Sequence, residues 1–452
     1  MNLVEAVESA GVVGEGGAGF PTHVKLNTSA KYFIINAAEC EPLIETDKYL
    51  SRTFPARLID AACKISRYLG AEKTVIAIKG KYKAEIEALQ GAIDVAAAGV
   101  EIFVMPTFYP AGDEQLIVQQ VCGVSVPERG IPIDVGAVVN NVGTVLSISE
   151  ALEGKNVTNK HLSVVGEVKM NIMLRVPVGT YITQCIEAAE PTLDRYAVII
   201  GGPMMGKILK GDEISRAVVT KTTGSLIVLP CDHHLIRQTE RSMSSIKLRA
   251  KSACIQCRMC TDLCPRYNTG HQIRPHLVMR NIWRENLIKD EGEYEKAFGD
   301  AVNCCDCGVC EMFACPMGLS PKTVNVYIKG ELRKKGIGAA KNNNPIPRRD
   351  IDLRRIPTHR LVARLGLEKY DGRPLKAGCG ELTPKCVHIP LKQHIGIPAV
   401  PVKQVGDLVQ VGELIAAIPE KGLSANIHAS VTGRVSALTD EYMEITRGEV
   451  RD

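Results

Sequence analysis

The sequence predicts a multidomain protein that combines an α/β domain, two β-rich modules and a helical segment built around cysteines. Three observations lead to this fold class. The chain has 452 residues, which at roughly 150 residues per domain suggests about three domains. Hydrophobic residues make up 45% and charged residues 23%, as in chains with packed cores. The chain also has 16 cysteines, and nine of them fall between Cys254 and Cys315.

The first 155 residues alternate apolar runs with amphipathic stretches, as α/β domains do. Residues 32–39, 74–80 and 100–106 have the length and apolar character of buried strands. A helical pattern that starts at Tyr82 separates the second run from the third. We therefore expect a domain over residues 1–155 in which helices cover a sheet.

Two later parts of the chain have the pattern of short strands joined by glycine turns. The first spans residues 156–237 and includes one short helix, predicted near residues 183–189. The second spans residues 379–452 and has the pattern of a small β structure made of two similar halves. Both parts predict compact β-rich modules.

The stretch between the cysteine segment and the last module is strongly basic. From Lys329 to Arg364 there are eleven Lys/Arg and three Asp/Glu. Its proline and asparagine content predicts a linker or a wrapping arm, which we place at residues 331–378. Aromatic residues, which stack on bases in nucleic-acid-binding proteins, make up only 4% of the chain. We therefore expect no nucleic acid and favour an acidic partner or a solvated linker.

The cysteine segment, residues 238–330, contains the same motif twice. The first run has the spacing of bacterial ferredoxin cluster loops, and the second repeats it with one extra residue in the last gap. In such proteins the fourth cysteine, which precedes a proline, ligates the other cluster. The sequence therefore predicts two [4Fe–4S] clusters, one held by Cys254, Cys257, Cys260 and Cys315, the other by Cys304, Cys307, Cys310 and Cys264.

Structural zinc is the alternative for these cysteines. It favours two separated CxxC pairs in closed tetrahedral sites, whereas eight cysteines in two CxxCxxC runs favour clusters. Cys305 is a spare thiol beside the second run, either a substitute ligand or an inert neighbour. Cys379 and Cys386 have no further ligand nearby and are interpreted as structural or free thiols.

A glycine-rich stretch near the N-terminus, Gly14 to Phe20, offers backbone that can closely approach a phosphate. A purely structural turn is the alternative. Three polar segments, residues 36–42, 109–115 and 140–144, each follow an apolar run. Because α/β domains bind ligands at the carboxyl ends of their strands, these segments favour a binding site there.

The four segments GEGGAGFPTHVK, NAAECEP, YPAGDEQ and NNVGT resemble the flavin- and NADH-binding fold of the flavoprotein subunit of respiratory complex I. They resemble the C subunit of the Rnf electron-transport complex more closely. The resemblance covers essentially the whole chain and implies four folds: a Rossmann-like FMN/NADH-binding domain, a β-grasp module, a double-[4Fe–4S] ferredoxin-like segment and a barrel-sandwich hybrid. Their order is similar to that in the cobalamin reductases of propanediol-utilisation bacterial microcompartments.

The resemblance also implies roles for individual residues. NADH would be handled by Phe20, as a stacking surface, and by Glu41 and Glu114. Two positions depart from complex I: Glu15 stands where that family has Arg, and Ala38 where it has Asp. FMN would be held by Gly14, Gly16, Gly17, Gly19, Lys25, Asn36, Glu39, Gly112, Asp113, Asn140, Asn141 and Thr144.

The function that the resemblance implies is electron transfer from NADH through FMN and two clusters to a corrinoid, with no side chain acting as general acid or base. Two alternatives remain: an Rnf-like NADH/ferredoxin module, and a non-catalytic adaptor that contains clusters. Expected protein partners are an adenosyltransferase and a microcompartment shell or cluster protein. The sequence contains no transmembrane run and no signal-peptide pattern, so we expect a cytoplasmic protein within a microcompartment.

Overall fold

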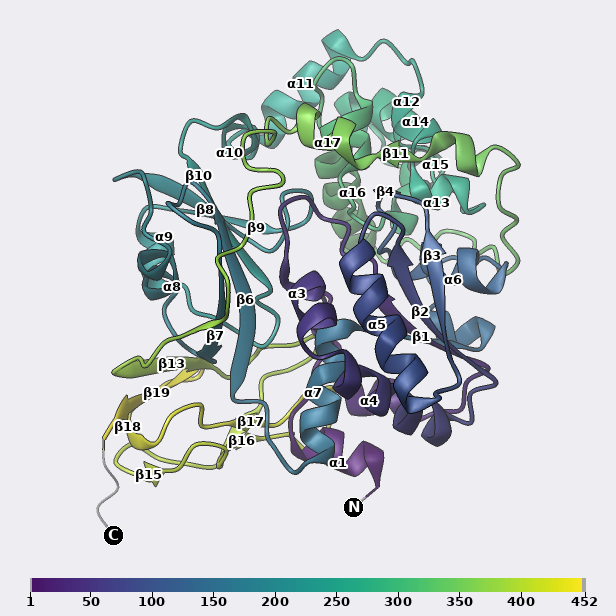
Figure 1. Ribbon diagram of the computed structural model, residues 1–452. Coiled ribbons are helices and arrows are strands. Elements are labelled where there is room, and N and C mark those ends of the chain that lie inside the picture. The colour runs from purple at the N-terminus through teal and green to yellow at the C-terminus, as the bar shows by residue number, and fades with distance from the viewer. Residues whose placement is uncertain (1, 449–452) are drawn as a thin grey trace.

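The computed structural model describes residues 2–448 and contains four modules (Figure 1). The N-terminal domain and the sheet of the first β module lie beside each other. The helical cysteine segment lies at one end of both, and the C-terminal module lies at the other end, below the β module.

The N-terminal domain is built on a four-stranded parallel sheet in the order β3-β2-β1-β5. Alternate residues of β1 face opposite sides. Phe33 and Ile35 pack in the core under α4, α5 and α7, and Ile34 packs in the core that contains α6. Strands β2 and β3 lie on one side of β1 within the sheet, and β5 lies on its other side. A topological switch point therefore lies between β1 and β5. The strands are β1 (Tyr32–Ala37), β2 (Lys73–Lys79), β3 (Val100–Met105) and β5 (Ala137–Asn141).

The helices of this domain match the expected amphipathic stretches, including the helix predicted after Tyr82. Helix α4 begins with a proline and ends at Gly70, which has a left-handed backbone. The elements around the sheet are α1 (Leu3–Ser9), α2 (Thr22–Leu26), α3 (Thr46–Thr53), α4 (Pro55–Leu69), α5 (Lys83–Ala96), β4 (Phe108–Tyr109), α6 (Glu114–Cys122), η1 (Pro132–Val135) and α7 (Val142–Leu152).

The first β module is a six-stranded mixed sheet in the order β12-β7-β6-β10-β8-β9. Its central strands β6 and β10 are parallel, and α8 packs on one face. Strand β12 (Gly380–Glu381) joins this sheet although its residues fall within the range expected for the last module. The other elements are β6 (Asn159–Gly166), β7 (Ile172–Pro177), α8 (Ile182–Ala188), β8 (Tyr196–Ile200), β9 (Lys207–Lys210), α9 (Asp212–Arg216) and β10 (Ser225–Pro230).

The two cysteine runs fold as structural repeats. Gln256 and Arg258 in the first run have left-handed backbones, as do Asp306 and Gly308 at the same positions of the second. The extra residue of the second run is taken up by a π-helix, η4 (Val309–Ala314), where the first run has the short helix α12 (Met259–Asp262). The other helices are α10 (His234–Gln238), α11 (Met243–Ala253), α13 (Pro265–Asn268), α14 (Pro275–Asn281), η2 (Ile282–Leu287), α15 (Glu291–Phe298), η3 (Gly299–Asn303) and α16 (Pro321–Lys335).

The C-terminal module consists of two small sheets, β13-β19-β18-β15 and β14-β16-β17, around one apolar core. A fully buried lysine ties it to the rest of the chain: Lys221 Nζ donates to the carbonyl oxygens of Gly11 (2.7 Å) and Asn426 (2.6 Å). The strands are β13 (Cys386–Pro390), β14 (Val400–Pro401), β15 (Leu408–Val409), β16 (Leu414–Ala417), β17 (Ile427–His428), β18 (Gly433–Leu438) and β19 (Tyr442–Arg447).

The basic stretch over residues 331–378 differs from a solvated linker. It contains the end of α16, then η5 (Ile351–Arg354), β11 (Ile356–Pro357) and α17 (Thr358–Arg364). Strand β11 pairs with β4 of the N-terminal domain, and Leu361 of α17 is fully buried in the core that also holds Cys307. Its apolar residues therefore make it a wrapping arm that closes the cysteine segment onto the other modules.

We expect Leu361→Ala to lower the free energy of unfolding by about 2–5 kcal/mol, because it leaves a cavity beneath α17. Chemical denaturation of the reconstituted protein measures the change. Arg360→Ala, at the exposed neighbouring position, is the control and should have little effect. Equal stability of Leu361→Ala and wild type would mean that the arm adds nothing to the core.

Candidate functional site

The glycine-rich loop is closed by its own backbone. The Gly14 amide donates to the Phe20 carbonyl (2.8 Å), and the Gly19 amide donates to the Gly14 carbonyl (3.2 Å). Gly17 has a φ of 117°, and a Cβ added there would meet no heavy atom within 4 Å. The loop therefore keeps part of its backbone open, as a loop that binds a phosphate requires.

Hydrogen bonds connect this loop to the predicted segments at the carboxyl ends of β1 and β5. The Glu15 amide donates to Thr144 Oγ1 (2.9 Å). Asn141 Nδ2 donates to Asp47 Oδ2 (2.6 Å), and the Asp47 amide donates to Glu39 Oε2 (3.2 Å). The structure thus brings the glycine loop, NAAECEP and NNVGT to the switch point between β1 and β5.

The YPAGDEQ turn joins the same region. Asn36 Nδ2 donates to the Gly112 carbonyl (2.9 Å), and Lys25 Nζ pairs with Glu114 Oε1 (2.7 Å). Lys25, predicted to neutralise a phosphate, therefore already has a carboxylate partner. All four predicted segments meet in one place.

Four buried polar atoms of the predicted segments have no protein partner: Thr22 Oγ1, Glu41 Oε1, Gln115 Oε1 and Asn140 Nδ2. Buried polar groups are normally hydrogen-bonded, so an unpaired amide and an unpaired carboxylate oxygen fit a site that a polar ligand completes. Together with the open glycine loop, they are compatible with FMN bound at the switch point. The predicted role of each residue toward FMN or NADH stays a prediction.

Asp113, predicted to line the flavin, pairs with a buried arginine. Its carboxylate accepts two hydrogen bonds from the buried guanidinium of Arg266, at 2.6 and 2.8 Å. Oδ1 also caps helix α6 by accepting from the amides of Gln115 and Leu116. Because Arg266 follows Cys264 and Pro265, this ion pair binds the N-terminal domain directly to a cysteine loop.

Three carboxyl groups at the site are held partly neutral by loss of hydration. Burial, with the nearby Asp47 carboxylate, raises the pKa of Glu39 to about 8. Burial raises the pKa of Glu41 to about 7 and that of Asp47 to about 6. Glu41 Oε2 accepts from the Met204 amide (2.9 Å), so this carboxyl group faces the first β module.

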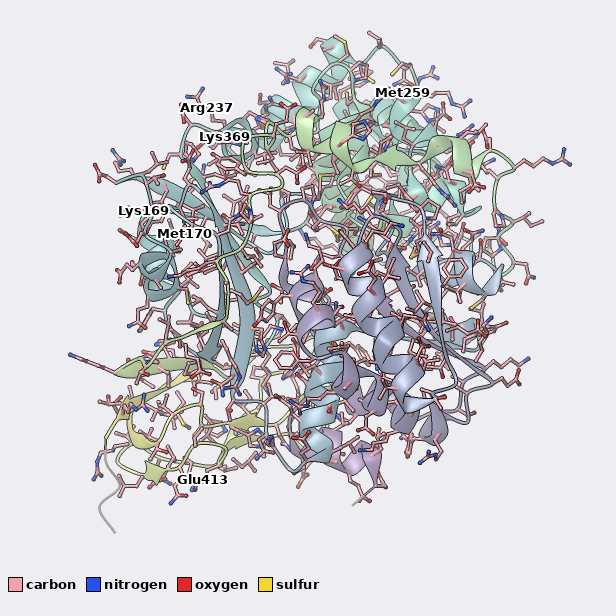
Figure 2. The ribbon with its side chains drawn as sticks, viewed as in Figure 1. Lys169, Met170, Arg237, Met259, Lys369 and Glu413 are labelled. Carbon is pink, nitrogen blue, oxygen red and sulfur yellow. The ribbon has the colours of Figure 1, made fainter. Side chains whose placement is uncertain are left out.

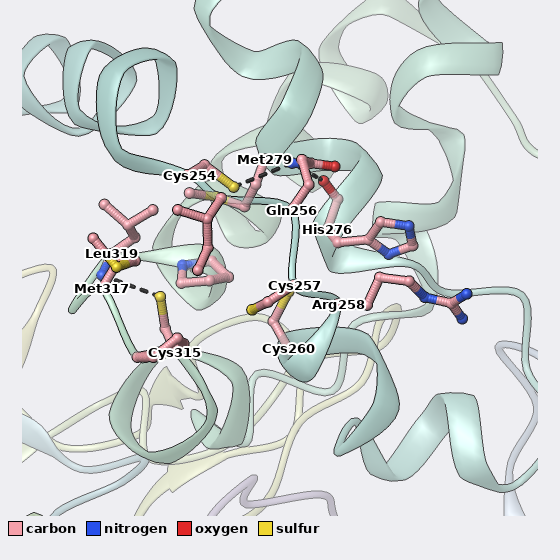
Figure 3. A pocket seen from close by; sticks show the side chains of 13 residues that line it. Cys254, Gln256, Cys257, Arg258, Cys260, His276, Met279, Cys315, Met317 and Leu319 are labelled. Atoms are coloured by element: carbon pink, nitrogen blue, oxygen red, sulfur yellow. Dashed lines mark hydrogen bonds between the residues drawn. The ribbon is translucent and has the colours of Figure 1, made fainter.

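Four of the predicted ligands line one pocket, which we call the outer cysteine site: Cys254, Cys257, Cys260 and Cys315 (Figure 3). Gln256 Nε2 donates to Cys254 Sγ (3.1 Å), and the Leu319 amide donates to Cys315 Sγ (3.4 Å). Burial and the neighbouring thiols raise the pKa of Cys260 to about 12. Four converging sulfurs with hydrogen-bond donors in an apolar pocket fit a [4Fe–4S] cluster.

The other four gather in a second place, the inner cysteine site: Cys264, Cys304, Cys307 and Cys310. Burial and the nearby thiols of Cys304 and Cys264 raise the pKa of Cys310. The loop is held from the N-terminal domain, since Tyr109 Oη donates to the Cys307 carbonyl (2.7 Å). The fourth cysteine of each run therefore lies near the first three of the other. The predicted crossed ligation of two clusters by these cysteines stays a prediction.

Cys305 lies within hydrogen-bonding reach of Cys307, and this contact lowers the pKa of Cys305 to about 7. The ligand-swap alternative for Cys305 therefore stays open. Cys379 and Cys386 are partly buried free thiols. Within residues 2–448, no three His, Cys, Asp or Glu side chains are close enough to hold a single metal ion. Thiolates around a four-iron cluster stand farther apart than the ligands of one ion.

Sequence reasoning missed three residues that organise the site. Arg266 pairs with Asp113, Asp47 bridges Glu39 and Asn141, and Lys160 of β6 pairs with the buried Glu15. The Lys160 contact gives the Glu15 carboxylate a nearby basic partner, and burial lowers the pKa of that lysine to about 7. The only sequence signal was a lysine at the start of an apolar strand; its partner Glu15 lies 145 residues away in the chain.

Comparison with known proteins agrees with these modules. Residues 7–150 match the Nuo51 FMN-binding domain family, residues 253–320 the 4Fe-4S dicluster domain family and residues 380–450 the RnfC barrel sandwich hybrid domain family. A flavin-type domain joined to a dicluster segment defines the class of iron–sulfur flavoproteins.

Two relatives extend over almost the whole chain. The cobalamin reductase PduS of Salmonella typhimurium is 40% identical over 98% of this chain and 96% of its own length. PduS of Citrobacter freundii is 39% identical over 99% and 97%. The C subunit of the Na(+)-translocating ferredoxin:NAD(+) oxidoreductase complex of Acetobacterium woodii is 31% identical over 62% of this chain and 61% of its own. The chain belongs to the PduS family.

Among residues 2–448, no helix is both long and apolar enough to span a membrane.

We expect Asp113→Asn to lower the free energy of unfolding by about 3–5 kcal/mol, because the buried Arg266 guanidinium loses its charged partner. Urea denaturation measures the loss. Glu114→Gln, which breaks the exposed pair with Lys25 one residue along, is the matched control and should cost only about 0–1 kcal/mol. Similar losses in the two variants would contradict a joining role for the Asp113–Arg266 pair.

The raised pKa of Glu41 predicts a pH dependence. Between pH 4.5 and about 7 the folded state binds more protons at this group than the unfolded state, so its contribution to stability falls as pH rises. Glu41→Gln removes this effect. We therefore expect the stability of Glu41→Gln relative to wild type to increase across this range in flavin-free protein, measured by denaturation at a series of pH values. Glu87→Gln, on the exposed face of α5, is the control; a relative stability that stays level in Glu41→Gln would refute the assignment.

Proposed function

We propose that the protein is an NADH-dependent cobalamin reductase. In this function electrons pass from NADH through FMN and two [4Fe–4S] clusters to a corrinoid. The observation that carries the proposal is the arrangement of the two cysteine sites: the inner one packs against the N-terminal domain, and the outer one has Cys257 at the surface. The near-full-length similarity to cobalamin reductases supports the corrinoid as acceptor.

The chain's own residues position the reactants. When bound, FMN would supply hydride acceptance and one-electron release, and clusters at the two cysteine sites would supply one-electron transfer. The amides of Gly16 and Gly17 would bind the flavin phosphate, with Lys25 close by, while Asn140 would use its unpaired amide on the flavin. Phe20, Glu41 and Glu114 are proposed to receive NADH. No side chain is required as a general acid or base.

The Asp113–Arg266 pair has a second role in this proposal. It joins the turn that would line the flavin to the segment that carries Cys264. Since electron transfer depends steeply on distance, a rigid ion pair at this junction would hold the flavin and the inner cysteine site at a fixed separation. The electron order is then flavin, inner site, outer site.

A second candidate is an Rnf-like module that exchanges electrons between NADH and a ferredoxin. It is favoured by the 31% identity to the C subunit of the Acetobacterium woodii complex. An anaerobic NADH assay with hydroxocobalamin and an artificial dye in parallel separates the two functions. Rapid dye reduction without corrinoid turnover would favour the Rnf-like module, and cluster-containing protein that reduces neither dye nor corrinoid would favour an adaptor.

The cellular setting is part of the same proposal. We propose a cytoplasmic protein housed in a bacterial microcompartment, next to an adenosyltransferase and a shell or cluster protein. The resemblance to the cobalamin reductases of propanediol-utilisation microcompartments and the near-full-length similarity to PduS support this setting. Purification of intact microcompartments, followed by detection of the chain in them with an antibody, tests it.

We expect Cys257→Ala to remove the outer cluster and with it the transfer of electrons from NADH to corrinoid. Iron should fall from about eight to about four atoms per chain, with flavin content unchanged. Iron analysis, electron paramagnetic resonance and the corrinoid assay measure these quantities. Cys63→Ala, in α4 of the N-terminal domain, is the control. A corrinoid rate that survives loss of the outer cluster would contradict the relay.

A further inference from the structure

Large apolar side chains lie exposed at and beside the outer cysteine site. Ile255 and Met317 line the site, Met259 directly precedes its ligand Cys260, and Leu248 lies in α11, the helix that leads into Cys254. These four side chains are between 41% and 66% exposed. Cys257 is itself exposed, and Met259 lies on the outer side of the helical segment (Figure 2). Exposed apolar side chains of this kind are typical of interaction sites.

Basic residues border this apolar surface. Residues 241–261 contain five Lys/Arg and no Asp/Glu. Arg241 and Arg249 reach the Gly318 carbonyl, at 2.9 and 3.5 Å, which places them beside Met317. Lys251 lies over the ring of the half-exposed Trp283, at 4.9 Å from its centroid.

Two acidic groups near this surface are already paired, and a third, Glu311, is buried and accepts hydrogen bonds from Thr323. Asp262 contacts both Arg258 (3.5 Å) and Arg354 (3.4 Å). Glu285, almost fully buried, pairs with Lys247. Arg249 and Lys251 have no acidic partner among the described residues. The surface around the outer cysteine site therefore carries net positive charge.

We propose that this surface, made of Leu248, Arg249, Lys251, Ile255, Met259 and Met317, docks an acidic electron-carrier protein. An apolar centre with a charged border is the usual composition of a specific interface, and opposite charge steers the partner into place. The inference rests on the proposed function, in which electrons leave from the outer site, and it places a carrier protein between that site and the corrinoid. One NADH, oxidised to NAD⁺ with release of a proton, supplies two electrons and reduces two one-electron carriers in succession.

The positive charge of this surface favours an acidic partner over a second copy of the chain. Two copies joined through this surface would bring the same cations together across the interface, and like charges there cost several kcal/mol. An acidic partner replaces that repulsion with attraction and covers the apolar side chains. The inner cysteine site offers no comparable surface, because Cys264, Cys307 and Cys310 are buried.

The test measures binding of the reconstituted protein to an acidic plant-type [2Fe–2S] ferredoxin as probe, with basic cytochrome c as the mismatched carrier. We expect the ferredoxin to bind and its affinity to fall about tenfold or more between about 20 and about 300 mM NaCl. Arg249→Glu/Lys251→Glu should weaken binding by a similar factor. Lys155→Glu/Lys169→Glu, which reverses two exposed charges elsewhere, is the matched control; Lys169 lies far across the molecule from Met259 (Figure 2).

Three results would overturn the docking surface: no preference for ferredoxin over cytochrome c, equal weakening by the two double variants, or self-association that Arg249→Glu/Lys251→Glu abolishes. Leu248→Ser, which keeps all charges, should weaken binding without changing its dependence on salt. The readout is independent of the proposed function, since reduction of dye and corrinoid by NADH is measured separately. A protein that reduces corrinoid but does not bind acidic carriers would contradict only the docking proposal.

Discussion

The buried ion pair between Asp113 and Arg266 is the contact on which the arrangement of the site depends. Its aspartate caps the helix that follows the YPAGDEQ turn, and its arginine follows the Cys264-Pro265 end of a cysteine run. Taking two charges out of water is costly unless both are fully hydrogen-bonded, so this pair tolerates little displacement. The N-terminal domain and the cysteine segment are therefore held in one relative position.

That position gives the two cysteine sites different surroundings. The inner site lies in a core to which the N-terminal domain, the first β module and the arm all contribute. The outer site opens at Cys257 among exposed apolar and basic side chains. Burial and hydrogen bonding tune the potentials of iron–sulfur clusters, so two loops with the same motif would hold clusters of different character.

Much of the local structure could be predicted because it depends on spacing. Two-residue gaps between cysteines and alternation of apolar residues determine loop and strand geometry within a few residues. The arm was harder to predict: its charge and prolines resemble a linker, and its burial depends on Leu361 finding a core made by other modules. The pairing of Asp113 could not be predicted, because the turn by itself does not reveal Arg266, which lies 153 residues away.

The sequence by itself determined the cofactor chemistry that the chain can support. It predicts two crossed sets of four cysteines, a glycine-rich loop, and polar segments at the ends of the strands that follow this loop. Ligand type and spacing are local properties, and they survive in any fold that keeps the loops intact. The tertiary structure alone decided which cysteine site adjoins the N-terminal domain and which faces the solvent. The placement of the two sites depends on long-range packing and on one buried ion pair. The residues next to each partner of this pair in the sequence do not indicate that the pair forms.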